Sequence, residues 1–328
     1  MGNVKKYARE VQSLMKIKPC SIFVICVLVF LSGCGKKDNS MESREGTYFD
    51  TAISIGGYSE DSKKVLDGSF ELCEELENTF SRTKKSSELY KVNHRTANQV
   101  EISNDLAKVI QEGIRFYKIT DGKFDITVEP LLELWDFKNG SKIIPEQEKI
   151  DEALLKVDGS SIQLSGNILS FKRADTKIDL GALAKGYAAD KLKEYLNTHG
   201  VKSAMINLGG NVLAVGAKPD GSPWNVGIQK PFAAQGETAD VLQVRDQSVV
   251  SSGIYERYFK KDGKIYHHIL DSDTGYPADT EDSQVTIVGK SSLLGDALST
   301  VCILMGEERS KEIVSQFPEA TLYPIANE

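Results

Sequence analysis

Asp296 and Thr300 are the residues whose types and spacing point most directly to metal chemistry. They interrupt an apolar stretch, residues 291–305, whose composition predicts a buried helix. At a spacing of four residues, both side chains lie on one face of such a helix. A buried carboxylate is costly unless it is paired or bound to a cation, and an aspartate with a hydroxyl offers the hard oxygen ligands that suit Mg²⁺. The helix alone leaves two interpretations open, a magnesium site and an internal hydrogen bond between the two side chains.

A second segment, residues 177–190, reads as a strand end, a glycine turn and the first turns of a helix. Asp179 stands just before the turn and Lys185 just after it. A helix N-terminus offers free backbone N–H groups and a partial positive charge, so it suits a phosphate or another anion. Asp179 is then available to a metal or to a ribose hydroxyl. Taken alone, the segment fits an ordinary strand-to-helix corner equally well.

Two polar turns carry further candidates. Residues 120–128 place a glycine turn before an extended segment, and residues 267–277 run from a strand into a turn in which His268 lies beside carboxylates. A histidine in such a place can act as a general base or orient a phosphate. Each turn also has a purely structural interpretation, as does the glycine pair Gly209-Gly210, which favours a tight hairpin. No phosphate-binding loop or GxGxxG fingerprint occurs in the sequence.

The elements that must position these residues mix helices with hairpin-linked strands. Apolar periodicity predicts helices over residues 61–81, 86–93, 146–157, 182–198, 291–305 and 307–316, and another that is capped by Asn104 and ends at Asp121-Gly122. Strands are expected near residues 48–55, 162–172 as a hairpin, 204–208, 212–215, 225–229, 241–244, 265–270, 284–288 and 321–323. This pattern predicts an α+β fold with mixed, largely antiparallel sheets rather than a doubly wound parallel sheet.

The first 33 residues are predicted to be a lipoprotein signal peptide. A basic segment precedes an apolar run, residues 22–31, that is short for a membrane-spanning helix, and the run ends in Leu31-Ser32-Gly33-Cys34. Small residues before a cysteine match a lipobox, so Cys34 is expected to carry lipid, with residues 34–46 as a polar tether and residues 47–328 as a single large domain. A plain secretory signal or an uncleaved anchor is the alternative.

Charge and cysteine content narrow the class of protein. Residues 1–33 hold five basic side chains and one acidic one, so their removal takes the formal net charge from −7 to −11. A nucleic-acid binder needs a basic face, so we do not expect nucleic acid as a partner. Cys73 and Cys302 fall on apolar helical faces and are expected to be buried free thiols, with neither a disulfide framework nor a CxxC metal site.

Six segments occur in one order, and together they resemble the FAD:protein FMN transferase (ApbE-type) lipoproteins. They are Phe124-Asp125-x-Thr127-Val128, residues 179–190, Asn207-Leu208-Gly209-Gly210-Asn211, Ser252-Gly253, residues 268–275 and residues 296–300. Residues 45–47 and 86–89 resemble the opening segments of that family. Each segment is weak evidence, whereas the ordered set is specific and covers essentially the whole mature chain.

The resemblance implies an ApbE-type, T-fold-like domain that binds FAD and Mg²⁺ and moves FMN onto a threonine or serine hydroxyl of a partner protein, with release of AMP. It implies that Asp296 and Thr300 hold the metal with the backbone carbonyl of Ala182, and that His268 assists the transfer. The positions that fall where the family contacts FAD are Phe124, Asp125, Asp179, Lys185 and Leu270. The implied partner is a flavin-carrying subunit of a membrane redox complex, met on the extracytoplasmic face of the cell membrane.

Two alternatives and two departures accompany this interpretation. The same metal site would serve an FAD pyrophosphatase that releases FMN and AMP, and a flavin-binding lipoprotein without turnover would need no metal pair at all. Ser272 stands where the family commonly has a proline, which predicts a looser turn, and Lys185 stands where some members have glutamate.

Overall fold

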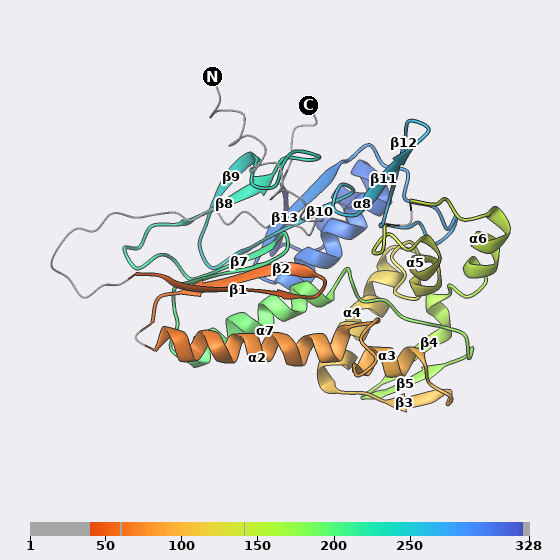
Figure 1. Cartoon of the computed structure of the whole chain (residues 1–328), viewed down its shortest axis with the longest axis horizontal. Coiled ribbons are helices and arrows are strands. Elements are labelled where there is room, and N and C mark those ends of the chain that lie inside the picture. Colours follow the sequence, from red (N-terminus) through yellow and green to blue (C-terminus); the bar gives the residue numbers. More distant parts are fainter. Residues whose placement is uncertain (1–39, 60, 141, 324–328) are drawn as a thin grey trace, which may run out of the picture. The chain divides into compact units, whose positions relative to one another are not determined.

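A computed structural model describes residues 40–59, 61–140 and 142–323, and its central feature is a seven-stranded sheet (Figure 1). Every neighbouring pair of strands in this sheet is antiparallel. In spatial order the strands are β1 (Glu42–Tyr48), β2 (Thr51–Gly57), β6 (Ala204–Leu208), β7 (Asn211–Val215), β10 (Ser248–Gly253), β13 (Gln284–Gly289) and β14 (Ala320–Tyr323).

Three long helices accompany the sheet. Helix α7 (Ala184–Thr198) packs against α8 (Ser292–Val314) and against β6 and β7, while α8 also packs against β10 and β13. Helix α2 (Ser62–Phe80) lies along α7 and β1 (Figure 1). Because α7 and α8 are wedged between strands and other helices, residues on their contact faces are placed with little freedom.

The remaining described elements form three smaller sheets and further helices. The smaller sheets pair β3 (Gln99–Glu101) with β5 (Ile168–Phe171) and β4 (Ile162–Ser165), β8 (Trp224–Gln229) with β9 (Thr238–Val244), and β11 (Tyr258–Lys261) with β12 (Lys264–His267). The other helices are α4 (Asn104–Ile119), which is as long as α7, and the shorter α3 (Glu88–Asn93), α5 (Glu129–Trp135), α6 (Gln147–Leu154) and the 3-10 turn η1 (Gly159–Ser161).

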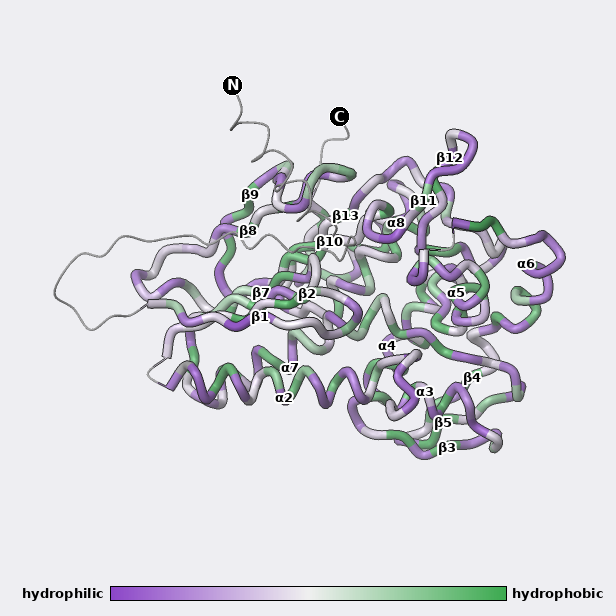
Figure 2. The backbone as a smooth tube through the Cα atoms, in the orientation of Figure 1, coloured by the Kyte–Doolittle hydropathy of each residue, from purple (hydrophilic) through white to green (hydrophobic). Residues whose placement is uncertain are grey.

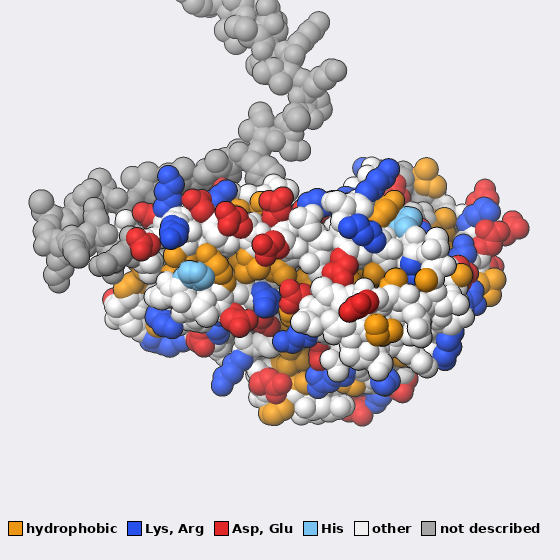
Figure 3. All heavy atoms as spheres, turned by 90° about the horizontal axis from the view of Figure 1, so that it is seen from below, with side chains coloured by type: hydrophobic (Ala, Val, Ile, Leu, Met, Phe, Trp, Pro, Cys, Tyr) orange, Lys and Arg blue, Asp and Glu red, His pale blue; other side chains and the backbone are white. Residues whose placement is uncertain are grey.

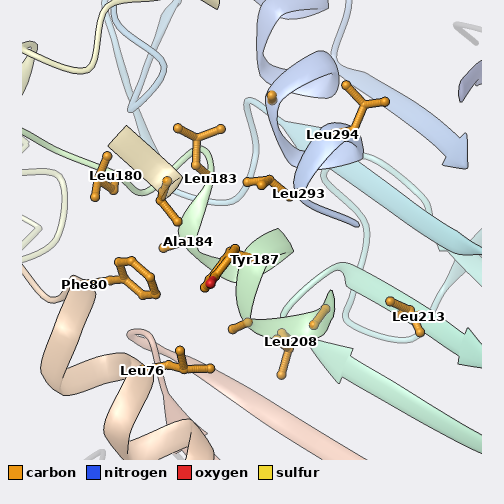
Figure 4. Close-up of a cluster of buried hydrophobic side chains, with 14 of the residues drawn as sticks. Leu76, Phe80, Leu180, Leu183, Ala184, Tyr187, Leu208, Leu213, Leu293 and Leu294 are labelled. Carbon is orange, nitrogen blue, oxygen red and sulfur yellow. The ribbon is translucent and has the colours of Figure 1, made fainter. Parts of the chain in front are cut away.

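Apolar side chains gather in separate clusters, two of which bear on the site. The main cluster lies between the sheet and its helices, and Figure 2 shows the hydropathy of these segments. Figure 4 shows the part where α2, α7, α8 and the sheet meet, with Leu76, Phe80, Tyr187, Leu208, Leu213 and Leu293 among its members. The second cluster joins α5, α6 and the β11–β12 hairpin and consists of Leu131, Trp135, Ile150, Ala153, Phe259 and Leu270.

Most predicted helices are confirmed. Those over 61–81, 86–93, 146–157 and 182–198 appear as α2, α3, α6 and α7. The predicted break between 305 and 307 appears as a kink in α8 at Gly306, where φ is +71°. The predicted cap of α4 is wrong by one residue, because the Ser103 hydroxyl accepts the N–H of Leu106 and Asn104 is already helical.

Several predicted strands need correction. The single strand over residues 48–55 is a hairpin, since Phe49 and Asp50 both adopt left-handed backbone conformations and turn β1 into β2. Ser252-Gly253, one of the six segments of the resemblance, is the end of strand β10 (Ser248–Gly253), for which no strand was predicted. The extended segment expected after the 120–122 turn gives way to α5, because the chain turns at residues 124–128 before Pro130 begins a helix.

The predicted tether is also wrong at its C-terminal end. Glu42 to Gly46 belong to strand β1, where they pair with residues 53–57 of β2, so the folded domain begins earlier than residue 47. Polar side chains do not prevent this, because an edge strand exposes one side to solvent. The signal peptide and the lipidated Cys34 lie outside the described residues.

Other features concern the surface and the thiols. Within the described residues, no helix has the length and apolar character needed to cross a bilayer. Cys73 and Cys302 are buried and free, as predicted. On the face seen in Figure 3, acidic and basic side chains are interspersed rather than gathered into one basic field.

Candidate active site

The site begins at the contact between α7 and α8. A Cβ atom on Gly186 would lie 2.4 Å from the backbone oxygen of Ser292 and 2.7 Å from the Cα of Leu293, so only glycine permits this approach. One turn later, Asp190 caps α8 by accepting the N–H of Ser292 at 2.8 Å and that of Leu293 at 3.1 Å. The glycine and the capping aspartate of one motif therefore align the helix that carries Asp296.

Asp296 is almost completely buried, with 3% of its surface exposed. Its Oδ2 atom accepts the backbone N–H of Gly186 at 2.8 Å, and its Oδ1 atom lies 3.9 Å from Nζ of Lys185. Lys185 also donates to the carbonyl of Gly181 at 3.2 Å. The two motifs recognised in the sequence thus meet through a carboxylate, an ammonium group and the amides at the start of α7.

The bond between Gly186 and Asp296 has a consequence for Ala182. A helical Gly186 would normally donate to the carbonyl four residues back, but its N–H is engaged by Asp296. Among the described residues, no hydrogen bond reaches the Ala182 carbonyl. This carbonyl is therefore available as a ligand, which agrees with the role that the resemblance implies for it.

The Thr300 hydroxyl completes the predicted ligand set. It lies 3.4 Å from the hydroxyl of Ser252, which in turn is 2.7 Å from that of Ser299. In the part of the chain that the structure describes, no three His, Cys, Asp or Glu side chains gather as a metal cluster. A magnesium site here would rest on one carboxylate, one hydroxyl and one carbonyl, a hard oxygen set that fits Mg²⁺ and leaves positions for water and substrate phosphate.

Asp179 belongs to a partly buried network of charges. Its Oδ2 atom lies 3.0 Å from Nε of Arg82, whose Nη1 atom donates to Oε1 of Glu129 at 2.9 Å. Burial raises the pKa of Glu129 to about 8, helped by the charge of Asp179 and opposed by Arg82. The other Asp179 oxygen accepts the N–H of Gly181 at 2.8 Å, so the carboxylate is held at the strand-to-helix corner.

The two adjacent histidines have different surroundings. His267 is buried, and its ring nitrogens contact the Ala278 carbonyl at 3.1 Å and the Ile269 N–H at 3.3 Å. The Nδ1 atom of His268 is shielded from solvent and has no hydrogen-bond partner among the described residues. Burial, together with the positive charges of Arg257 and Lys185, lowers the pKa of His268 to about 3. His268 is thus a neutral imidazole, in which one ring nitrogen carries a proton and the other can accept one.

Glu256 is a candidate that sequence reasoning missed. It follows the predicted Ser252-Gly253 segment by three residues and is exposed as a residue. Surrounding protein atoms desolvate its carboxylate and raise its pKa, with Lys185 and Arg257 opposing the shift and Asp296 adding to it. Glu256 therefore faces the charges of Lys185 and Arg257, as His268 does. No signal in the local sequence identifies it.

The remaining predicted FAD contacts are mostly internal. The Phe124 ring is buried in the main cluster, tilted against Phe116, so its backbone is the part left to reach a ligand. Asp125 accepts three internal hydrogen bonds, two from Thr127 and one from the N–H of Gly159. Leu270 is buried in the second cluster. Their contact with FAD stays a prediction, and Asp125 also has a clear structural role.

Comparisons with known proteins identify the family of the chain. A model of the ApbE family matches residues 46–323, which includes every candidate residue described above. The chain belongs to the ApbE family. The match begins within β1 and ends at the last described strand, so the family domain coincides with the folded part of the chain.

The family relatives are similar over most of their length. A FAD:protein FMN transferase of Treponema pallidum is 31% identical over 90% of this chain and 87% of its own, and one of Klebsiella pneumoniae is 33% identical over 83% and 85%. Among solved structures, a flavin transferase ApbE from Vibrio cholerae superimposes with a TM-score of 0.78 at 28% identity, over 86% of this chain and 93% of that one. An ApbE protein from Thermotoga maritima also gives 0.78, at 31% identity over the same shares.

Proposed function

We propose that this chain is an FAD:protein FMN transferase that moves FMN from FAD onto a threonine or serine hydroxyl of a target protein and releases AMP. The observation that carries the proposal is the meeting of Lys185 and Asp296: an ammonium group lies 3.9 Å from a buried carboxylate, and its charge also acts on the neutral His268. Phosphoryl transfer needs alignment and neutralisation of charge more than covalent catalysis by the protein.

His268 is the group that takes the proton. In the transfer, the acceptor oxygen forms a bond to the phosphorus of the FMN half, and the bond from that phosphorus to the oxygen of AMP breaks. The proton of the acceptor hydroxyl passes to a ring nitrogen of His268, which is neutral because burial lowers its pKa to about 3. AMP leaves with the electron pair of the broken bond. A phosphoester bond to the acceptor then replaces the bond that joined the two phosphates of FAD.

Lys185 and the start of α7 supply positive potential to the site. The ammonium group is half-buried and held by the Gly181 carbonyl, so little reorganisation is needed to face a diphosphate. Asp179, held by Arg82, is placed to accept a hydrogen bond from a ribose or ribityl hydroxyl. These contacts would orient FAD before the acceptor arrives.

Magnesium is the cofactor that we propose for this site. Asp296, Thr300 and the Ala182 carbonyl would hold it, and when bound it would neutralise the charge of the pyrophosphate and of the departing AMP. The support is the unpartnered carbonyl beside a buried carboxylate and a hydroxyl.

We further propose that the enzyme is attached to the extracytoplasmic face of the cell membrane through lipid on Cys34 and flavinylates a subunit of a membrane redox complex. The support is the lipobox Leu31-Ser32-Gly33-Cys34 and the acidic charge of the chain that follows it. A Cys34→Ser variant should appear in the soluble fraction. Retention on membranes would indicate an uncleaved anchor.

The test of the activity uses the chain from residue 35 onward with FAD, MgCl₂ and a flavin-accepting domain. We expect the acceptor to gain the mass of FMN while AMP appears in equal amount. The variant His268→Gln should still bind FAD but transfer at a strongly reduced rate. Rapid release of free FMN without an acceptor would identify a pyrophosphatase instead, and FAD binding with no AMP from any mixture would identify a non-catalytic flavin-binding protein.

A further inference from the structure

Two turns flank the proposed FAD site, one around Gly122-Lys123 and the other around Asp271–Gly275. Polar contacts join these turns across the boundary between the two hydrophobic clusters, which we call the seam. The first turn precedes Phe124 in the main cluster, and the second follows Leu270 in the second cluster. Apolar contacts hold the chain next to the turns, since Ile269 belongs to the main cluster and Val128 packs against the second. Polar side chains then join the turns themselves to one another.

Lys123 makes the strongest of these contacts. Its ammonium group lies 2.9 Å from Oδ2 of Asp271 and 2.7 Å from Oδ2 of Asp273. Lys123 is about one-third exposed, and Asp271 is less exposed still, so solvent screens this pair only in part. A single lysine therefore bridges two carboxylates of the opposite turn.

Ser272 adds a second link from the other side. Its hydroxyl donates to the Gly122 carbonyl at 3.1 Å, with the Lys123 carbonyl at 3.4 Å. The sequence predicted a looser turn at this position, where the resembling family commonly has proline. The structure shows instead that the serine ties its turn to the neighbouring one.

Each turn is closed by its own hydrogen bonds, so a link between the two turns fixes the position of one relative to the other. The first is closed by the Gly122 N–H, which donates to the Tyr117 carbonyl at 2.8 Å. The second is closed by the Gly275 N–H, which donates to Asp271, and it is anchored by the Trp135 indole, which donates to the Gly275 carbonyl at 2.8 Å. Movement at the seam would therefore displace whole turns rather than single side chains.

We propose that Lys123 and Ser272 are positioning residues of the FAD site, which clamp the turn leading to Phe124 and Asp125 against the turn that follows His268 and Leu270. The proposal rests on the proposed function, because it assigns the two turns to FAD. Neither side chain needs to touch the reacting atoms. Together they hold the walls of the site at the spacing that the substrate requires.

The experiment compares Lys123→Met, Ser272→Ala and Lys123→Arg with the wild-type chain. We measure the dissociation constant of FAD by fluorescence, the KM for FAD and kcat for transfer, and the melting temperature without ligand. A small misplacement of binding groups can cost up to about 100-fold in rate, so Lys123→Met should raise the dissociation constant and KM about tenfold and Ser272→Ala about threefold. Lys123→Arg should restore most of the affinity.

Lys193→Met is the matched control. Lys193 also bridges distant segments, 2.8 Å from Asp246, but lies away from both turns. Unchanged FAD affinity in Lys123→Met would overturn the proposal, as would an equal loss in Lys193→Met or a lowered melting temperature with unchanged affinity. A wild-type chain that binds FAD but transfers no FMN would contradict the proposed function alone, since the affinity comparison would still decide about the clamp.

Discussion

The α7–α8 junction and the pair of turns beside it are held together by different forces. At the junction, Gly186 brings two helix backbones into contact, Asp190 caps α8, and Asp296 is buried among the side chains of the main cluster. At the turns, Lys123 and Ser272 form polar links across a seam at the surface. The α7–α8 side of the site is part of the hydrophobic core. The two turns on the other side are joined by polar side chains at the surface.

This difference has consequences for tolerance to change. Close-packed backbones accept almost no added volume, so the junction can vary little in sequence. Polar links at a partly exposed seam are individually weaker and depend on ionic conditions, so they can be exchanged for other links. We therefore expect substitutions at the α7–α8 junction to cost more than substitutions at the two turns.

The largest expected effect comes from removing the buried carboxylate. Asp296→Ala should lower FMN transfer by more than about 100-fold, because even partners outside a ligand shell typically contribute about 10- to 100-fold. Asp296→Asn keeps an acceptor for the Gly186 N–H but not the charge. It should fold like the wild type and remain inactive at all Mg²⁺ concentrations. Activity of the asparagine variant would place the metal elsewhere, as judged by the mass of the acceptor.

The next effect tests the packing of the junction. Gly186→Ala should force α7 and α8 apart and cost about 1–3 kcal/mol of unfolding free energy, with a parallel loss of transfer. Urea denaturation followed by circular dichroism measures the first quantity. Gly68→Ala in α2 is the control, since its added methyl meets the hydroxyl and ring of a single side chain, Tyr195, and no backbone atom. Equal stability of the two variants would contradict the close-contact argument.

A smaller effect concerns the charge network behind Asp179. The pKa of Glu129 is raised to about 8 from an ordinary 4.5, so between these values the folded state holds a proton that the unfolded state has lost. Unfolding free energy should therefore fall as pH rises from 5 to 8, by at most about 1.4 kcal/mol per pH unit for one proton. Glu129→Gln should flatten this slope. Superimposable stability profiles for the two proteins would refute the shift.

The smallest expected effect concerns the pH profile of the reaction, in which the inflection typical of a histidine base should be absent. An ordinary histidine base would lose activity below about pH 6.5, but the pKa of His268 is lowered to about 3. The profile of kcat/KM for FAD reports groups of the free enzyme, so it should be flat with respect to this residue between pH 5 and 8. An acid limb near 6.5 that disappears in His268→Gln would show that the imidazole is better solvated than the structure indicates.

Sequence patterns predicted the parts of the fold that local chemistry controls. The apolar periodicity of α2, α7 and α8 and the turn at Gly166-Asn167 were sufficient for their placement. The hairpin of β1 and β2 was missed, since its turn uses Phe49 and Asp50 in left-handed conformations rather than glycine or asparagine. The short strands β3 and β11 were also missed, because three or four residues carry too little periodicity.

Predictions about the site were strongest for charged groups and weakest for their partners. Asp296 and Lys185 lie 3.9 Å apart and the charge of Lys185 acts on His268, whereas the side chains of Phe124 and Leu270 are packed in the core. The network of Arg82, Glu129 and Asp179 was not foreseen. Arg82 and Glu129 are 47 residues apart, and the local sequence around one gives no indication that it pairs with the other.

By itself, the sequence determined the order of the motifs, the family they belong to and the residue types available for chemistry, because these depend on composition and spacing along the chain. Only the tertiary structure decided which carbonyl is left free at Ala182, which of the two histidines has an unpartnered Nδ1 atom, and how Ser272 replaces a proline as a tie between turns. Each of these depends on a contact between distant segments. Such contacts depend on how the side chains pack, and this packing forms only when the whole chain has folded.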